Sequence, residues 1–301
     1  MIVLAHVSDL HATRPRLRHP GEILNKRALG LLSWLVRRRR EHRHYVLEAL
    51  IDDLERTQPD HVAVTGDLTQ LGLLREFEQA LGWLRRLGDP VRVSLVPGNH
   101  DVQVRSRQAR SWQHWGEYMR SDPGADAKVV FPSLRIRDGL ALVGVSSAEP
   151  SAPFLATGRV GRSQREALEE SLGKLSGRGL FRVVLIHHPP TDVGLAQRRR
   201  LTDASAVRDA IARGGADLVL HGHTHQTAAS AIPGANGPIP VAGVPSASAL
   251  GRRGDARRAR YHVYRIEPGE SAGSFQIRRE VRGYRPESGC FESEGEAPVQ
   301  G

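Results

Sequence analysis

Asp, His and Asn side chains recur in this sequence directly after short apolar runs. They lie in five stretches: Asp9-Leu10-His11, Gly66-Asp67, Gly98-Asn99-His100-Asp101, His187-His188-Pro189-Pro190 and Gly222-His223-Thr224-His225. Carboxylate and amide oxygens and imidazole nitrogens are common ligands of divalent metal ions. The single cysteine, Cys290, lies far along the chain in a Gly/Glu/Ser-rich tail. The pattern therefore predicts a metal site with oxygen and nitrogen ligands and no thiolate.

The number of candidate ligands predicts two ions rather than one. Consecutive imidazoles point to opposite sides of an extended chain, so at most one of His187 and His188 is expected to reach an ion. Together with one of these two histidines, six further residues make seven candidate ligands: Asp9, His11, Asp67, Asn99, His223 and His225. Seven donors are too many for one catalytic ion that must keep a coordination position open. Manganese is our first choice of metal, and iron or zinc would also suit these donors.

Two such ions would be suited to phosphoester hydrolysis. Cations about 3.5–4 Å apart need a shared anionic ligand, for which we choose Asp67. The pair lowers the pKa of a bridging water, so that a bridged hydroxide can attack, and it clamps a phosphoryl oxygen. We expect His100 to stabilise the developing charge or to protonate the leaving oxygen, and Asp101 to hold the other nitrogen of its imidazole.

The candidate ligands require several buried strands that end at one place. Continuous apolar runs predict strands at 2–7, 62–64, 91–96, 140–146, 181–186 and 217–220. Helical spacing of apolar residues predicts helices at 41–56, 74–87, 106–120, 162–175 and 204–213. Shorter strands are expected at 240–244, 261–266 and 274–281, largely antiparallel. This alternation predicts an α/β protein, because open α/β sheets place their ligands at the carboxyl edge of the strands.

Length and composition indicate a globular chain with a sizeable core. The chain has 301 residues, of which 39% are apolar and 5% aromatic. We expect a single domain over residues 1–285 and a disordered tail over 286–301, which has four Glu and no Lys or Arg. The start of the chain lacks the pattern of a signal peptide, and no apolar run is long enough to span a bilayer. We therefore predict a cytoplasmic location, with a peripheral one on the inner membrane face as a candidate.

Most of the net charge of +10 comes from one segment. Residues 14–43 carry ten Lys or Arg and two acids, so any anionic partner is expected there. Within the basic insert 12–40, residues 23–36 form an amphipathic stretch followed by four arginines. It could lie on an anionic membrane surface or cap the site for a bulky anionic substrate. It could equally be a charged helix docked on the core, with its arginines in water.

The five motifs, in this order, resemble those of the calcineurin-like metallophosphoesterase family. The resemblance covers residues 1 to about 250 and is closest to bacterial cyclic-nucleotide-phosphodiesterase-like members. It implies a four-layer αββα sandwich of two mixed sheets, with a dinuclear metal site on loops at one sheet edge. It also implies that His100 is catalytic, and its His-x-Pro spacing selects His187. The implied ligands are Asp9, His11, Asp67 and His225 for one ion, and Asp67, Asn99, His187 and His223 for the other.

The leading hypothesis is a hydrolase that cleaves phosphodiester or phosphomonoester bonds of small molecules. A second hypothesis uses the basic segment: a peripheral pyrophosphatase on a nucleotide-activated lipid, similar to the UDP-diacylglucosamine hydrolases of this family. A third is a nuclease or a protein that binds nucleic acid, which the few aromatics make the weakest. The sequence does not fix the substrate, because one fold and one metal site serve many phosphoesters.

Overall fold

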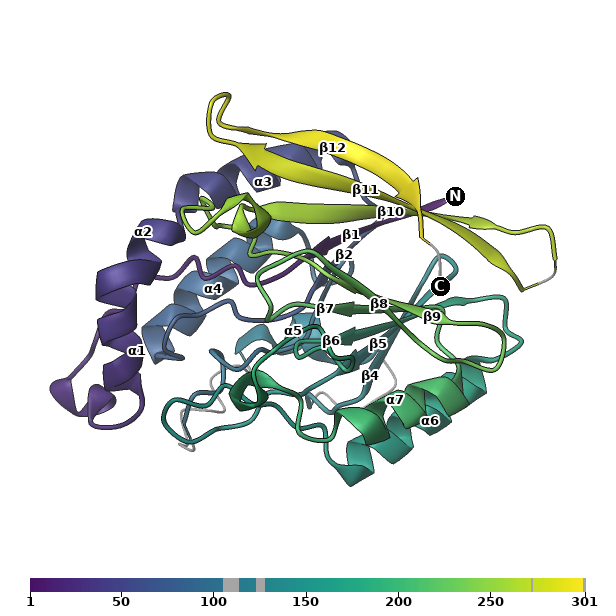
Figure 1. Cartoon of the computed structure of the whole chain (residues 1–301), viewed down its shortest axis with the longest axis horizontal. Helices are drawn as coiled ribbons and strands as arrows, with labels where there is room; N and C mark the ends of the chain where they lie inside the picture. Colours follow the sequence, from purple (N-terminus) through teal and green to yellow (C-terminus); the bar gives the residue numbers. More distant parts are fainter. Residues whose placement is uncertain (105–113, 123–127, 272, 300–301) are drawn as a thin grey trace.

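Two six-stranded β-sheets form the centre of the protein (Figure 1). The computed structural model describes residues 1–104, 114–122, 128–271 and 273–299. The first sheet has the order β12 (Cys290–Pro298), β11 (Phe275–Arg285), β10 (Arg260–Pro268), β1 (Ile2–Val7), β2 (His61–Val64) and β3 (Val93–Leu95). The second has the order β4 (Ser133–Arg137), β5 (Leu140–Val145), β6 (Phe181–Ile186), β7 (Leu218–His221), β9 (Ile239–Gly243) and β8 (Ala228–Ile232).

Helices cover the outer faces of the two sheets. The first sheet packs against three helices, α3 (His44–Thr57), α4 (Leu74–Leu87) and the short α5 (Gly116–Met119). Their buried apolar residues belong to the same core cluster as residues of this sheet. The helices α6 (Arg162–Leu175) and α7 (Ala204–Gly214) pack on the second sheet, and Figure 1 shows them side by side beyond its strands. The predicted four-layer αββα sandwich of two mixed sheets is confirmed.

Successive side chains of a strand point to opposite faces of its sheet, and both faces are buried in these layers. In β6, Val184 and Ile186 belong to the core cluster under α6 and α7, whereas Val183 and Leu185 belong to the cluster between the two sheets. A strand whose two faces are both buried reads as a continuous apolar run, because side chains alternate between the faces. That is why Phe181–Ile186 has a single polar residue, Arg182, and no polar alternation after it.

The parallel strands end at one level, which places their following loops together. Strands β1, β2 and β3 are parallel, and their last residues pair as Val7 with Val64 and Val64 with Leu95. In the second sheet, β5, β6, β7 and β9 are also parallel. All the candidate ligands follow the carboxyl ends of β1, β2, β3, β6 or β7.

The basic insert contains an almost continuous helical segment. It begins with a 3-10 turn at Pro20–Ile23 and continues as α1 (Arg27–Ser33), a π-helical segment at Trp34–Arg38 and α2 (Arg39–Glu41). The predicted helix at 23–36 therefore extends to Glu41, through the arginine run. The predicted helix at 106–120 is described only from residue 114 onward, because 105–113 lie outside the described residues.

The prediction of a disordered tail at 286–301 is wrong over most of its length. Residues Cys290–Pro298 form β12, the edge strand of the first sheet, paired antiparallel with β11. Three of the four Glu that suggested disorder, Glu292, Glu294 and Glu296, are paired with arginines. Glu294 binds Arg258 and Arg260 at 2.5 Å, and Glu296 binds Arg278 at 2.8 Å. Residues 300–301 lie outside the described part, and the single domain over 1–285 stays a prediction.

Candidate metal centre

The backbone is left-handed at five of the candidate ligands. Positive φ angles occur at Asp9 (51°), His11 (43°), Asp67 (55°), His223 (67°) and His225 (54°). Such angles are uncommon for residues other than glycine, and they cost energy that surrounding structure must supply. The chain therefore turns sharply after β1, β2 and β7, and these turns direct the side chains to one point.

Four of these side chains form the first cluster. The ligand atoms of Asp9, His11, Asp67 and His225 all lie within 4.8 Å of one another. The Nε2 atom of His225 is 3.1 Å from Asp9 Oδ1, and His11 Nε2 is 3.8 Å from Asp67 Oδ2. His11 Nδ1 is oriented by the carbonyl of Thr69 at 3.0 Å, while its Nε2 is buried without a hydrogen-bond partner among the described residues. A buried imidazole nitrogen in this position fits a metal ligand.

The second cluster joins the two sheets. His187, which follows β6, lies with its Nε2 atom 3.4 Å from Asp67 Oδ2 and 3.2 Å from Asn99 Oδ1. Its Nδ1 atom donates to the carbonyl of Thr65 at 2.7 Å, so Nε2 is the nitrogen that would face an ion. The His223 ring lies 5.1 Å from the His187 ring, measured between centroids. All seven predicted ligands are thus brought to one place, with Asp67 facing both clusters.

Two glycines allow this close approach. A β-carbon at position 222 would overlap Ser8 Oγ and lie 2.5 Å from Asp9 Oδ2. A β-carbon at position 98 would overlap Asp67 Oδ1. Only glycine fits at these two positions, because any other residue would displace a candidate ligand.

Two further histidines border the centre. His188 has both ring nitrogens engaged, Nδ1 with Ser147 Oγ at 2.8 Å and Nε2 with the carbonyl of Ala156 at 3.3 Å. The choice of His187 over His188 agrees with this geometry. His42 packs against His11, with 4.7 Å between ring centroids, and its Nδ1 is 3.0 Å from Ser248 Oγ. Sequence reasoning missed His42, because it follows the basic helix rather than a strand.

Burial and charge set the protonation of these groups. Burial lowers the pKa of His11 to about 4, so its imidazole is neutral and able to bind a cation. Burial alone would also lower the pKa of His187, but the Asp67 carboxylate raises it to about 9. Burial would raise the pKa of Asp67, but His187 and His100 hold it well below its usual value. The carboxylate is therefore ionised, and its charge attracts cations to both clusters.

His100 lies beside Asp67, but Asp101 does not hold it. The carbonyl of Gln70 accepts a hydrogen bond from His100 Nδ1 at 2.8 Å, and the His100 backbone amide donates to Asp67 Oδ1 at 2.7 Å. The carboxylate of Asp101 instead accepts from the amides of Thr69 and Gly98, each at 3.0 Å. The prediction that Asp101 orients the His100 imidazole is wrong, because its oxygens already tie together the loops after β2 and β3.

Arg38 reaches the centre from the basic helix. Its Nη1 atom is 3.0 Å from His100 Nδ1, and its Nη2 atom donates to the carbonyl of Gly30 at 3.0 Å. Burial lowers the pKa of Arg38 to about 10, so the side chain remains a cation at neutral pH. The sequence offered no signal that would distinguish Arg38 from the three arginines beside it.

A pocket of about 290 Å³ opens next to this centre. Asn99, His100 and Arg38 lie along it, and Leu29, Phe154 and Leu155 add apolar surface. Its wall is closed by Lys26, whose Nζ atom donates to Ser151 Oγ at 2.6 Å. The pocket therefore offers space for an organic group beside the candidate ligands.

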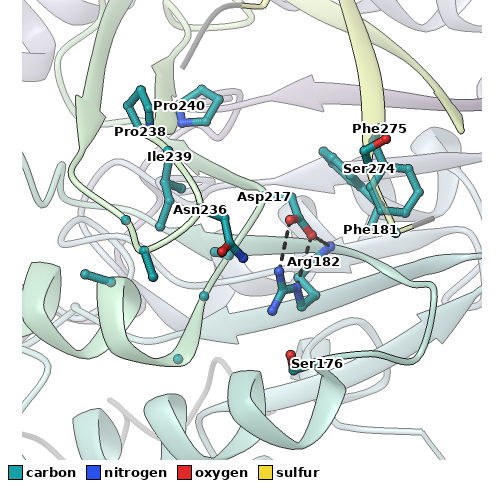
Figure 2. Close-up of a pocket in the computed structure, with 18 of the residues that line it drawn as sticks. Ser176, Phe181, Arg182, Asp217, Asn236, Pro238, Ile239, Pro240, Ser274 and Phe275 are labelled. Atoms are coloured by element: carbon teal, nitrogen blue, oxygen red, sulfur yellow. Dashed lines mark hydrogen bonds and ion pairs between the residues drawn. The ribbon is translucent and has the colours of Figure 1, made fainter. Parts of the chain in front are cut away.

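A second pocket, of about 530 Å³, lies at the opposite ends of the strands (Figure 2). Figure 2 shows its charged pair, in which Arg182 at the start of β6 binds Asp217 just before β7. The pair is bidentate, with distances of 3.1 and 3.0 Å, so the two charges neutralise each other. The candidate ligands follow the other ends of these strands, so we assign no chemistry to this pocket.

The fold and the ligand cluster together define a metallohydrolase-type centre. The chain belongs to the calcineurin-like phosphoesterase family, whose pattern it matches over residues 2–227. This is a family of phosphoester hydrolases that depend on two metal ions. Of the helices in the described part of the chain, none has the length and hydropathy needed to cross a membrane.

Two relatives are proteins of Synechococcus strains. The chain is 29% identical over 231 residues to a probable cyclic nucleotide phosphodiesterase of Synechococcus sp. (strain WH7803), covering 74% of each chain. It is 26% identical over 181 residues to a probable cyclic nucleotide phosphodiesterase of another Synechococcus strain (ATCC 27144), covering 59% of this chain. That match spans 62% of the relative's own length.

Solved structures share the fold at low identity. A dimetal phosphatase from Danio rerio superposes with a TM-score of 0.60 at 12% identity, covering 99% of this chain and 98% of the other. A purple acid phosphatase from yellow lupin (Lupinus luteus) seeds gives a TM-score of 0.62 at 12% identity, covering 99% of this chain and 53% of the other. These similarities support the fold.

Proposed function

We propose that this protein hydrolyses phosphodiester bonds of small molecules, with cyclic nucleotides as the first class to test. The observation that carries the proposal is the convergence of seven oxygen and nitrogen donors from both sheets around the buried carboxylate of Asp67. The names of the two Synechococcus relatives support the choice of substrate class. Phosphomonoesters are a second class for the same centre.

Each metal position would use one of the two clusters. Asp9, His11, Asp67 and His225 would hold one ion, and Asp67, Asn99, His187 and His223 the other. Bound there, the ions would supply Lewis-acid stabilisation of a phosphoryl group and would lower the pKa of a bound water. Manganese is proposed first, with iron or zinc as alternatives.

His100 is the proposed catalytic residue of the chain itself. It lines the pocket beside Asn99, and Gln70 fixes its Nδ1 side, so Nε2 remains for the leaving oxygen of a substrate. Asp101 would act only through the loops that it ties together. Neither the metal centre nor the relatives favour the lipid-pyrophosphatase or nucleic-acid hypotheses. The cytoplasmic location stays a prediction.

The test is hydrolysis of bis-p-nitrophenyl phosphate and of cyclic nucleotides by metal-free protein and by protein supplied with Mn²⁺. We expect turnover that depends on Mn²⁺ and is lost in Asp67→Asn and His100→Ala. The matched control is His19→Ala, which removes an exposed histidine of the basic insert and should leave the rate unchanged. A protein that is loaded with metal but inert toward the whole panel would refute the proposal.

A further inference from the structure

The helical segment Arg27–Glu41 has an inverted pattern of burial. Leu32 and Val36 are 59% and 57% exposed, whereas Arg27 is 3% exposed. The guanidinium of Arg27 donates to the carbonyls of Leu71 and Gly72, so a charged side chain is the most buried of the segment, while Leu31 and Trp34 are only partly buried. A helix that packs on a core normally turns its apolar residues inward. Packing within this chain therefore does not explain the exposed side chains.

The exposed apolar residues form a continuous face with a neighbouring loop. Leu29, Leu32, Leu35 and Val36 have the spacing of helix neighbours, and each is at least 40% exposed. Phe154, 79% exposed, lines the same pocket as Leu29. We call Leu29, Leu32, Leu35, Val36 and Phe154 the apolar face. An exposed group of large apolar side chains of this kind marks an interaction site.

Exposed cations follow the apolar face directly along the helix. Arg37, Arg39 and Arg40 are exposed, whereas the remaining arginine of the run, Arg38, points to the metal centre. The only acid in the segment, Glu41, accepts a hydrogen bond from the amide of Gly251 at 2.8 Å. The helix thus presents apolar side chains together with positive charge.

We propose that the apolar face and these three arginines dock the protein on the surface of an anionic lipid bilayer. A bilayer surface offers both an apolar region for the leucines and negative headgroups for the arginines. A second copy of the chain would instead set the same cations against one another. The pocket beside His100 opens at Leu29 and Phe154, so docking would turn its entrance toward the lipid. The docking itself does not depend on the proposed function, because binding is measured without substrate.

The test is flotation of the full-length protein with vesicles of phosphatidylcholine alone or with 30% phosphatidylglycerol. We expect binding to the anionic vesicles that weakens as salt is raised. The triple variant Arg37→Gln/Arg39→Gln/Arg40→Gln should bind about a hundredfold more weakly, because each arginine near such a surface contributes about 1 kcal/mol. Leu32→Ser/Val36→Ser should also lose binding, at least about tenfold, through lost apolar burial.

Matched controls distinguish the effect of the apolar face and its arginines from the effect of removing any exposed arginine or apolar side chain. Arg252→Gln/Arg253→Gln removes two exposed arginines of another loop, and Val91→Ser removes an exposed valine, so both should bind as the wild type does. No binding to anionic vesicles, or equal losses in variants and controls, would overturn the proposal. So would a concentration-dependent dimer in sedimentation that only Leu32→Ser/Val36→Ser abolishes, since a second copy would then cover the face.

Activity on soluble bis-p-nitrophenyl phosphate is measured for the same variants. We expect it to stay unchanged, because none of the substituted residues belongs to the metal centre. Loss of vesicle binding with normal turnover would support the docking face. An inert protein that still binds vesicles would refute the proposed function alone.

Discussion

Gly222→Ala should disrupt the metal centre through a single added methyl group. A β-carbon at position 222 would overlap Ser8 Oγ and lie 2.5 Å from Asp9 Oδ2. Ordinary contacts between heavy atoms of this kind are near 3.5 Å, so the carboxylate of Asp9 must move by about 1 Å. That carboxylate also accepts hydrogen bonds from Ser8 Oγ at 2.7 Å and from the amide of His223 at 3.0 Å. The methyl group therefore disturbs two of the loops that carry candidate ligands.

The expected magnitude follows from the tolerance of metal coordination. Ligand distances in metal sites vary by about 0.2 Å, so a shift of about 1 Å takes Asp9 out of range. We expect the affinity for Mn²⁺ to fall at least about 10- to 100-fold, the loss seen when even indirect partners of a ligand are removed. The free energy of unfolding of the metal-free protein should fall by about 1–3 kcal/mol, because the site is overpacked.

The assay is metal content after equilibrium dialysis at set Mn²⁺ concentrations, with thermal unfolding of the same samples. The control is Gly82→Ala in α4, where a β-carbon meets nothing within 4 Å. This change should leave metal binding intact and stabilise the fold by about 1 kcal/mol, because alanine is the better helix former. If Gly222→Ala bound manganese as tightly as the wild type, the argument from close approach would be refuted.

Two further predictions concern single side chains. Arg38→Gln should lower kcat/KM for bis-p-nitrophenyl phosphate about 100-fold, with partial rescue in Arg38→Lys, because it removes a cation beside His100. Arg37→Gln should not change it, and equal effects at both positions would contradict the assignment. Asp53→Asn should lower the free energy of unfolding at pH 7 by about 3–5 kcal/mol, because the buried Asp53 accepts hydrogen bonds from Arg282 and Tyr261. Burial would raise the pKa of Asp53, but Arg282 lowers it. The stabilisation by the ionised Asp53 carboxylate is therefore fully present above the pKa of an unfolded Asp, about 3.9, and is lost as pH falls through the lower pKa of Asp53 in the folded protein. Urea unfolding should show a smaller difference from wild type at pH 3 than at pH 7, and an unchanged difference would contradict it.

The sequence predicts that the candidate ligands lie at the ends of strands, because each follows a strand that is buried on both faces. The apolar runs before Asp9, Asp67 and His187 are recognisable locally, and parallel pairing brings their ends together. Asp9 and Asp67 also have positive φ angles, a consequence of the turns at the ends of β1 and β2. The sequence alone does not set which of His187 and His188 faces the centre. Their hydrogen bonds to Thr65 and Ser147 decide this.

The features that the sequence did not predict depend on partners far along the chain. Asp101 follows His100 directly, yet its oxygens accept hydrogen bonds from the amides of Leu68 and Thr69, 33 and 32 residues earlier. The acidic tail forms a strand because Glu294 meets Arg258 and Arg260. Arg37 and Arg38 are neighbours in the same π-helical segment, yet Arg38 lies 3.0 Å from His100 whereas Arg37 is exposed. The local sequence around Asp101, around the acidic tail and around Arg38 does not reveal these distant partners, so it could not predict the contacts.

The most direct test of the central claim is electron paramagnetic resonance of the protein loaded with Mn²⁺, with metal analysis of the same sample. Seven donors around a shared Asp67 predict two ions per chain, coupled to each other as expected for a separation of about 3.5–4 Å. The coupled signal should disappear in Asp67→Asn. Binding of a single uncoupled ion, or a coupled pair that survives loss of the Asp67 carboxylate, would contradict the account.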